Sequence, residues 1–186
     1  MTTTTEAKTL QGTYVADTVH SVFGFSALHN GISTYRGTLD DVSATLDASD
    51  AGDIKLQGAA KVESISIREP EAFRGHVLGG EFFDAENHPE VAFTSTKVEL
   101  GDDGSATVTG DLEIRGTSRE VTATGTYQAP VEGLDGERVA LELETKFDRR
   151  DYGFDWQMEL PNGGLALDWD ITLNIHLELV QAKEQD

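Results

Sequence analysis

Residues 139–147 read VALELETKF, and this short stretch decides which class of fold the chain forms. Val139, Leu141 and Leu143 alternate with polar residues, among them Glu142 and Glu144. Successive side chains of a β-strand point to opposite faces, so strict alternation predicts a strand with one apolar and one solvated face. The stretch is therefore expected to lie in a sheet that is buried on one side.

The same alternation extends along the chain in both directions. It returns in the closing segment from Trp169 to Leu179, and tight-turn signals such as Asn30-Gly31 and Asp135-Gly136 separate the runs. About eight to ten strands follow one another through such turns, which favours an all-β, antiparallel up-and-down topology. Residues 10–182 are expected to form this single domain, preceded by a flexible polar tail at residues 1–9.

Closure of the sheet into a barrel is predicted from the length of the strands. Several runs exceed ten residues, and long open edges promote aggregation, which closure prevents. An eight-stranded barrel holds either side chains alone or one small ligand. Several residues on the inward parity are small, which predicts an interior that is partly unfilled: Gly58, Ala60, Gly110, Ala123 and Gly125.

One stretch, residues 70–96, interrupts the alternation and reads PEAFRGHVLGGEFFDAENHPEVAFTST. Phe73 and Val77 are four residues apart, as on one face of a helix, and Gly79-Gly80 follows where a helix should end. A short helix near residues 71–79 is predicted. Because it is rich in apolar side chains, it is expected to cover one end of the barrel.

The composition excludes several classes of partner. The chain has 34 acidic and 14 basic residues and a formal net charge of -20, so it repels nucleic acid and anionic membranes. No apolar run approaches the roughly 20 residues of a membrane-spanning helix. The N-terminal residues do not resemble a signal peptide, and there is no cysteine, so we expect a cytoplasmic protein.

No catalytic, metal or cofactor site is predicted. Ser26 lies in GFSAL, which lacks the second glycine of a nucleophile elbow, and no nucleotide-binding glycine motif occurs. None of the five histidines has the helical spacing of a zinc site. His76, in the predicted helix, is a candidate polar contact for a ligand head group. Arg74 is a second candidate, although an ion pair with nearby acids is the preferred interpretation. The run Asp148-Arg149-Arg150-Asp151 could clamp a head group, although a solvated or internally paired turn is the preferred interpretation.

The order of several motifs resembles the YceI-like family of lipocalin-like polyisoprenoid-binding proteins. The matching segments are YVADTVHSVFGFSALHNGIS, SISI, FRGHVLGGEFFDAENHPEVAFTST, GDLEIRGTSREVTATG and FDRRDYGF, and they cover nearly the whole chain. The resemblance implies an extended eight-stranded antiparallel barrel with a long apolar tunnel. It also implies that the tunnel holds a long isoprenoid chain, such as a quinone tail or its precursor, or another lipid.

Within this framework, strand parity assigns residues to the ligand site. The expected tunnel wall comprises Phe23, Phe25, Phe82, Phe93, Ile114, Phe147 and Trp169. Phe73, His76 and Leu78 are expected at the mouth, and the aromatic Phe154 and Trp156 complete the predicted ligand-binding set. Such a pocket is mostly apolar with few polar groups, which is typical of small-molecule sites.

Two other functions fit the same residues. In the first, the protein is an enzyme that acts on a lipid or quinone head group through His76 and an acid. In the second, it is a filled β-domain without a ligand that acts through protein contacts or in a stress response. An antiparallel edge would also allow two copies to pair as a homodimer.

Overall fold

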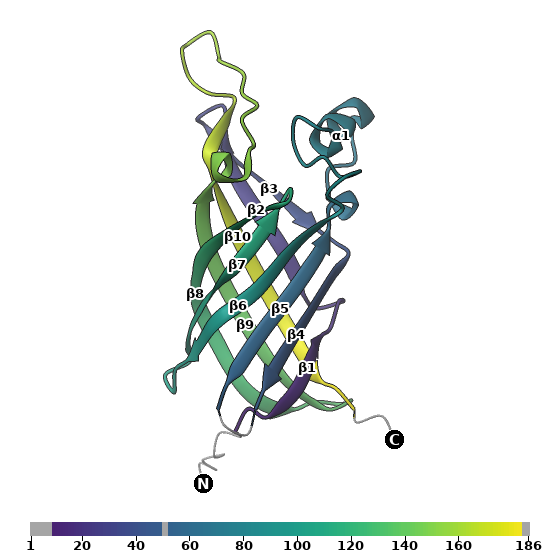
Figure 1. Ribbon diagram of the computed structural model, residues 1–186, viewed down its shortest axis with the longest axis vertical. Coiled ribbons are helices and arrows are strands. Elements are labelled where there is room, and N and C mark those ends of the chain that lie inside the picture. Colours follow the sequence, from purple (N-terminus) through teal and green to yellow (C-terminus); the bar gives the residue numbers. More distant parts are fainter. Residues whose placement is uncertain (1–8, 50–51, 184–186) are drawn as a thin grey trace.

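The computed structural model describes residues 9–49 and 52–183 (Figure 1). Residues 1–8 of the predicted tail lie outside the described residues. The described strands are β1 (Gly12–Ala16), β2 (Val22–His29), β3 (Ser33–Leu39), β4 (Val42–Ala48), β5 (Ile54–Lys61), β6 (Glu90–Leu100), β7 (Ser105–Ile114), β8 (Thr117–Glu132), β9 (Glu137–Asp148) and β10 (Leu167–Gln181). The helices are α1 (Glu71–Leu78) and two 3-10 turns, η1 (Val62–Ser64) and η2 (Arg149–Tyr152).

The strands form a closed antiparallel barrel. From β4 to β10 each strand pairs with the next, and β1 pairs with both β4 and β10, so that eight of the described strands complete the ring. The hairpin of β2 and β3 continues the wall, because β10 pairs with β1 near Leu179 and with β2 from Leu167 to His176. The eight-stranded antiparallel barrel is therefore confirmed, with ten strand segments occupying it.

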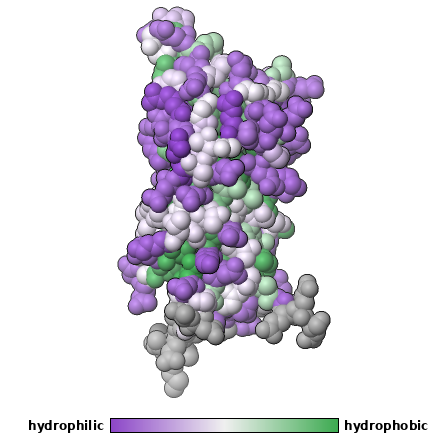
Figure 2. Space-filling model, viewed as in Figure 1, coloured by the Kyte–Doolittle hydropathy of each residue, from purple (hydrophilic) through white to green (hydrophobic). Residues whose placement is uncertain are grey.

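Alternation has the expected effect on burial. In β9, Val139, Leu141 and Leu143 are buried while Glu142 and Glu144 are exposed. The half of the barrel that contains β1 is filled by apolar side chains, among them the fully buried Tyr14, Leu46, Val108, Leu141 and Leu179. Figure 2 shows hydrophilic residues over most of one face, with apolar residues gathered in its lower half. The alternation along β9 therefore places apolar side chains inside the barrel and charged ones outside.

The other end of the barrel is covered by non-strand segments. Helix α1 and the loop that follows η2 both stand at this end (Figure 1). The helix follows Pro70 and ends at Gly79, as predicted, and it buries Val77. The loop folds back on itself through a bridge between Glu159 and Leu165, and the Asn30 amide donates to the Ala166 carbonyl. Among the described residues, no helix has the length and apolar character needed to cross a membrane.

Candidate functional site

A cavity of about 110 Å³ lies inside the barrel between the packed core and the covered end. Residues from all strands between β2 and β10 contribute to its wall, and apolar residues dominate it. Thr145 and Gln57 are the polar residues among those described that border it, and no described charged residue does. The space is therefore suited to hydrocarbon and offers no counter-ion for a charged ligand.

Three of the predicted tunnel residues, Phe23, Phe25 and Phe93, border this cavity. Phe25 also packs on Tyr35, with 6.2 Å between the ring centroids. The ring of Phe25 lies so close to Gly37 that a Cβ at Gly37 would stand 2.5 Å from it. A glycine on the neighbouring strand thus makes room for the aromatic ring.

The five small residues predicted on the inward face divide into two groups. Gly58, Ala60 and Ala123 border the cavity, so their size does leave space inside the barrel. Gly110 and Gly125 do not border it. A Cβ at Gly125 would collide with the backbone oxygen of Glu142, and one at Gly110 with that of Thr94. These two glycines allow neighbouring strands to approach closely. Their small size therefore serves the curvature of the sheet and does not create space for a ligand.

Several other predicted ligand residues pack above the cavity in one apolar cluster, which we call the aromatic cap. Its buried members are Phe82, Leu112, Ile114, Tyr152 and Phe154, and Phe93, Phe147, Trp156 and Leu173 are among the residues packed against it. Phe82, Ile114 and Phe147, which parity assigned to the tunnel wall, therefore lie outside the residues that border the cavity. The cap shares Phe93, Leu112 and Leu173 with the cavity wall, so the two are continuous.

His76 from α1 joins this cap from the side. Its ring meets those of Phe82 and Trp156 edge-on, each with 5.1 Å between centroids. Its Nδ1 lies 3.4 Å from a carboxylate oxygen of Glu81. Phe73, by contrast, is 46% exposed, and Leu78 packs against a separate cluster that contains Leu39 and Ile65. The three predicted mouth residues are thus in three different environments.

Trp169 is not in the cavity wall either. Its ring stacks against two guanidinium groups, with Arg149 Cζ 4.3 Å and Arg150 Cζ 4.8 Å from the ring centroid. Arg150 is exposed and pairs with Asp148, as the paired-turn interpretation predicted. Arg149 departs from it, because it is 2% exposed and its guanidinium donates to the carbonyl oxygens of Phe154, Asp168 and Leu167. Burial lowers the pKa of Arg149.

Two further arginines at this end also bind backbone carbonyls. Arg74 donates to the carbonyls of Glu63, Ile65 and Ile67, so the preferred expectation of an ion pair with nearby acids is wrong. Arg115 joins two segments of the covered end by donating to the Gly80 and Gly153 carbonyls. The alternation of apolar and polar residues does not predict such hydrogen bonds, because each joins segments that come together only in the folded protein.

Two buried polar atoms of the cap have no hydrogen-bond partner among the described residues: the Tyr152 hydroxyl and His76 Nε2. Tyr152 is 1% exposed, and burial, together with the charge of Asp151, raises its pKa to about 12. Its hydroxyl therefore keeps its proton at neutral pH and can donate. Buried polar groups usually find partners, so these two atoms are chemically distinctive within an apolar cluster.

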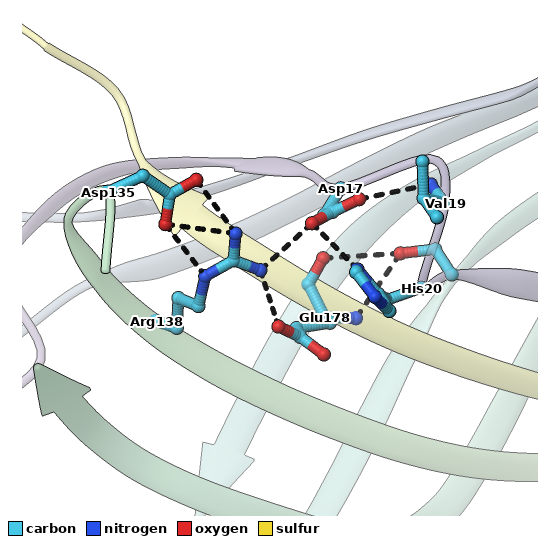
Figure 3. Close-up of polar contacts among 7 residues, drawn as sticks. Asp17, Val19, His20, Asp135, Arg138 and Glu178 are labelled. Carbon is cyan, nitrogen blue, oxygen red and sulfur yellow. Dashed lines mark hydrogen bonds and ion pairs between the residues drawn. The ribbon is translucent and has the colours of Figure 1, made fainter. Parts of the chain in front are cut away.

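A cluster of charged residues lies outside the cavity, where the chain passes from β1 to β2 (Figure 3). The Arg138 guanidinium lies between Asp135 on one side and Asp17 and Glu178 on the other, and it binds all three carboxylates. His20 Nδ1 lies 2.9 Å from Asp17 Oδ2. Asp17, His20 and Glu178 have the spacing of a metal site, but Arg138 supplies the positive charge that these acids share. The cluster therefore ties the β1–β2 connection to β9 and β10.

The pH dependence of this cluster can be tested through His20. Asp17 raises the pKa of His20 above the ordinary value of 6.5, so the charged imidazole stabilises the folded state. That stabilisation is complete below pH 6.5 and is lost as the pH rises through the folded-state pKa. We expect His20→Gln to lower the unfolding temperature by about 2 °C at acidic pH and by less at alkaline pH.

Thermal unfolding between about pH 5 and 8 measures this difference. His29→Gln, at an exposed position outside the cluster, is the control. A His20→Gln deficit that stays constant over the whole pH range would contradict the expected role of the charged imidazole. The pKa of Asp17 is held well below its usual range by hydrogen bonds from His20 and Arg138, so its carboxylate stays ionised throughout this window.

Comparison with known proteins gives consistent matches over most of the chain. The family model described as the YceI-like domain matches residues 14–179. A UPF0312 protein of Pseudomonas putida is 29% identical over 166 residues, which cover 88% of this chain and 79% of that protein. The crystal structure of the Campylobacter jejuni YCEI protein is 28% identical with a TM-score of 0.68, covering 96% of this chain and all of that one.

A more distant structure shares the fold. It is a polyisoprenoid binding domain from Saccharophagus degradans, at 13% identity with a TM-score of 0.61, and the match covers 91% of this chain and 98% of that one. At this level of identity the similarity concerns the barrel alone.

Proposed function

The chain belongs to the YceI-like family, and on that basis we propose that it binds a long-chain isoprenoid or similar lipid inside the barrel and carries or sequesters it. The observation that supports this proposal most directly is the cavity, whose wall is apolar and holds no described charged residue. The structural similarity to the polyisoprenoid binding domain of Saccharophagus degradans supports the same ligand class. No chemical conversion of the ligand is proposed.

Binding in such a cavity follows from hydrocarbon burial. Each buried methylene contributes about 0.8 kcal/mol, so affinity rises with chain length until the available space is filled. The cavity of about 110 Å³ is smaller than the roughly 300–1,000 Å³ of common ligand sites. A long chain would therefore displace side chains as it enters, and the rings of Phe23, Phe25 and Phe93 are the large groups that border the space.

The covered end is the proposed entrance. The described residues around Tyr14 and Leu141 form a packed apolar cluster, whereas the aromatic cap shares residues with the cavity wall. We propose that Phe82, Ile114, Phe147, Phe154 and Trp156 rearrange when a chain enters and then contact it. Phe73, His76, Leu78 and Trp169 would contact the outer part of the ligand.

Native mass spectrometry of the freshly purified protein tests the proposal. The cytoplasm, which the cysteine-free sequence suits, is the proposed compartment, so the protein is best produced there. We expect an added mass that solvent extraction releases and lipid analysis identifies as an isoprenoid or related lipid. A protein without an added mass is next titrated with menaquinone and squalene. Failure of both to bind the intact fold would remove the carrier function and favour a ligand-free domain.

A further inference from the structure

The hydroxyl of Tyr152 is a buried polar group whose role the packing of the described residues does not explain. Its side chain is among the largest of the fully buried ones, yet the hydroxyl has no partner among the described residues. Leaving a buried hydroxyl without a hydrogen bond costs about 1–3 kcal/mol. Phenylalanine would fill the same space without that cost, so contacts among the described residues give no reason for the hydroxyl.

Tyr14 provides the contrast within the same chain. It is also completely buried, at the opposite, packed half of the barrel, and its hydroxyl donates to the Glu137 carboxylate. There the phenolic group has a clear structural role. The two buried tyrosines therefore differ in whether another described residue accepts a hydrogen bond from the hydroxyl.

The surroundings of Tyr152 indicate which kind of ligand group could accept a hydrogen bond from its hydroxyl. Tyr152 belongs to the aromatic cap, which shares Phe93, Leu112 and Leu173 with the cavity wall, and its ring packs edge-on against Phe147 at 4.9 Å between centroids. A ligand chain in the cavity would thus place its head near this cluster. A protonated phenol is a hydrogen-bond donor and requires an oxygen acceptor. In an apolar cluster a neutral acceptor costs less to bury than an anionic one without a counter-ion.

Most of the described arginines at this end are engaged in contacts that hold the fold, whereas Arg119, whose charge acts on Tyr152, is exposed and donates to the Ser118 carbonyl. The guanidinium groups of Arg74, Arg115 and Arg149 all donate to backbone carbonyls, and Arg150 pairs with Asp148. To bind a diphosphate, these arginines would have to release contacts that hold the covering segments together. The formal net charge of -20 also repels an anion.

We propose that the Tyr152 hydroxyl is a specificity-determining hydrogen-bond donor that selects lipids whose head carries a neutral oxygen acceptor, such as a quinone carbonyl, over bare hydrocarbons and diphosphates. The inference rests on the proposed lipid-binding function and adds to it the residue that distinguishes one head group from another. His76 Nε2, the other unpartnered atom of the cap, is a neighbouring contact for the same head group.

The test is Tyr152→Phe in the full chain, with three probes: menaquinone, squalene and geranylgeranyl diphosphate. The wild type is expected to prefer menaquinone. In the variant, menaquinone affinity should fall about fivefold to tenfold, which is the effect of one neutral hydrogen bond, while squalene affinity stays unchanged. The unfolding temperature of the ligand-free variant should equal or exceed that of the wild type.

Tyr14→Phe is the matched control, because it also removes a buried phenolic oxygen, but one that donates a hydrogen bond to Glu137 within the protein. It should lower the unfolding temperature and leave the preference for menaquinone over squalene intact. Equal menaquinone binding by wild type and Tyr152→Phe would overturn the role assigned to Tyr152 but not the proposed lipid-binding function. The same holds if Tyr152→Phe lowers the unfolding temperature as much as Tyr14→Phe does. If the wild type binds neither menaquinone nor squalene, the proposed function itself fails.

Discussion

The Ala123→Leu variant is expected to bind a long-chain isoprenoid about a hundredfold more weakly than the wild type. Ala123 borders the cavity from β8, and the substitution adds three carbons that occupy space a ligand would need. Excluding three or four methylene equivalents at about 0.8 kcal/mol each removes roughly 3 kcal/mol of binding free energy. Titration with squalene measures the loss without any contribution from a head group.

Thr124→Leu is the matched control for this prediction. Thr124 is the next residue of the same strand and is exposed on the outer face, so it receives the same side chain outside the cavity. Circular dichroism and thermal unfolding establish that both variants are folded, since overpacking a core can cost about 1–3 kcal/mol. A folded Ala123→Leu variant with wild-type squalene affinity would show that the chain does not occupy this cavity.

Arg149→Met is expected to reduce the free energy of unfolding by about 3–5 kcal/mol and to lower the unfolding temperature by about 10 °C. The Arg149 guanidinium donates to the Phe154 and Asp168 carbonyls at 2.7 and 3.0 Å and more weakly to Leu167 at 3.4 Å. Methionine keeps much of the aliphatic stem but removes the guanidinium donor from the Phe154 and Asp168 carbonyls, while the Leu167 carbonyl still accepts from Gln157 Nε2. It also removes the stacking of the guanidinium on Trp169.

Arg150→Met makes the neighbouring change without the buried contacts. Arg150 is exposed and pairs with Asp148, an interaction worth about 0–1 kcal/mol, so its loss should have little effect. Hydrogen exchange locates the difference. Amides of residues 154–167 should exchange faster in Arg149→Met than in Arg150→Met. Comparable stability of the two variants would show that the buried carbonyl contacts do not hold the loop.

The barrel could be predicted from the sequence because its determinants are local. A period of two in residues 139–147 is enough to indicate a strand with one buried face, and glycine-containing turns divide the chain into antiparallel neighbours. The end of α1 at Gly79 is local in the same way. Parity also identified Phe23, Phe25 and Phe93, which do border the cavity.

The other residues of the candidate site could not be placed correctly from the alternation of side chains along a strand. Alternation states that Ile114 and Phe147 point inward, but it does not state how far along the barrel the open space extends before the aromatic cap begins. It likewise assigned Trp169 to the tunnel wall, whereas two arginines of η2 stack on its ring. Those neighbours come from a segment that folds over the barrel end and has no periodic pattern.

The sequence by itself determined the all-β class, the antiparallel order from β4 to β10, the helix α1 at one end of the barrel and the apolar interior. Each of these depends on residues a few positions apart. Tertiary structure alone decided which polar groups are satisfied. Arg149 and Tyr152 both belong to η2, yet Arg149 donates to backbone carbonyls while the Tyr152 hydroxyl has no partner within the part of the chain that the structure describes. The physical reason is that a hydrogen bond requires two atoms within about 3 Å of each other, and that proximity is set by the packing of distant segments.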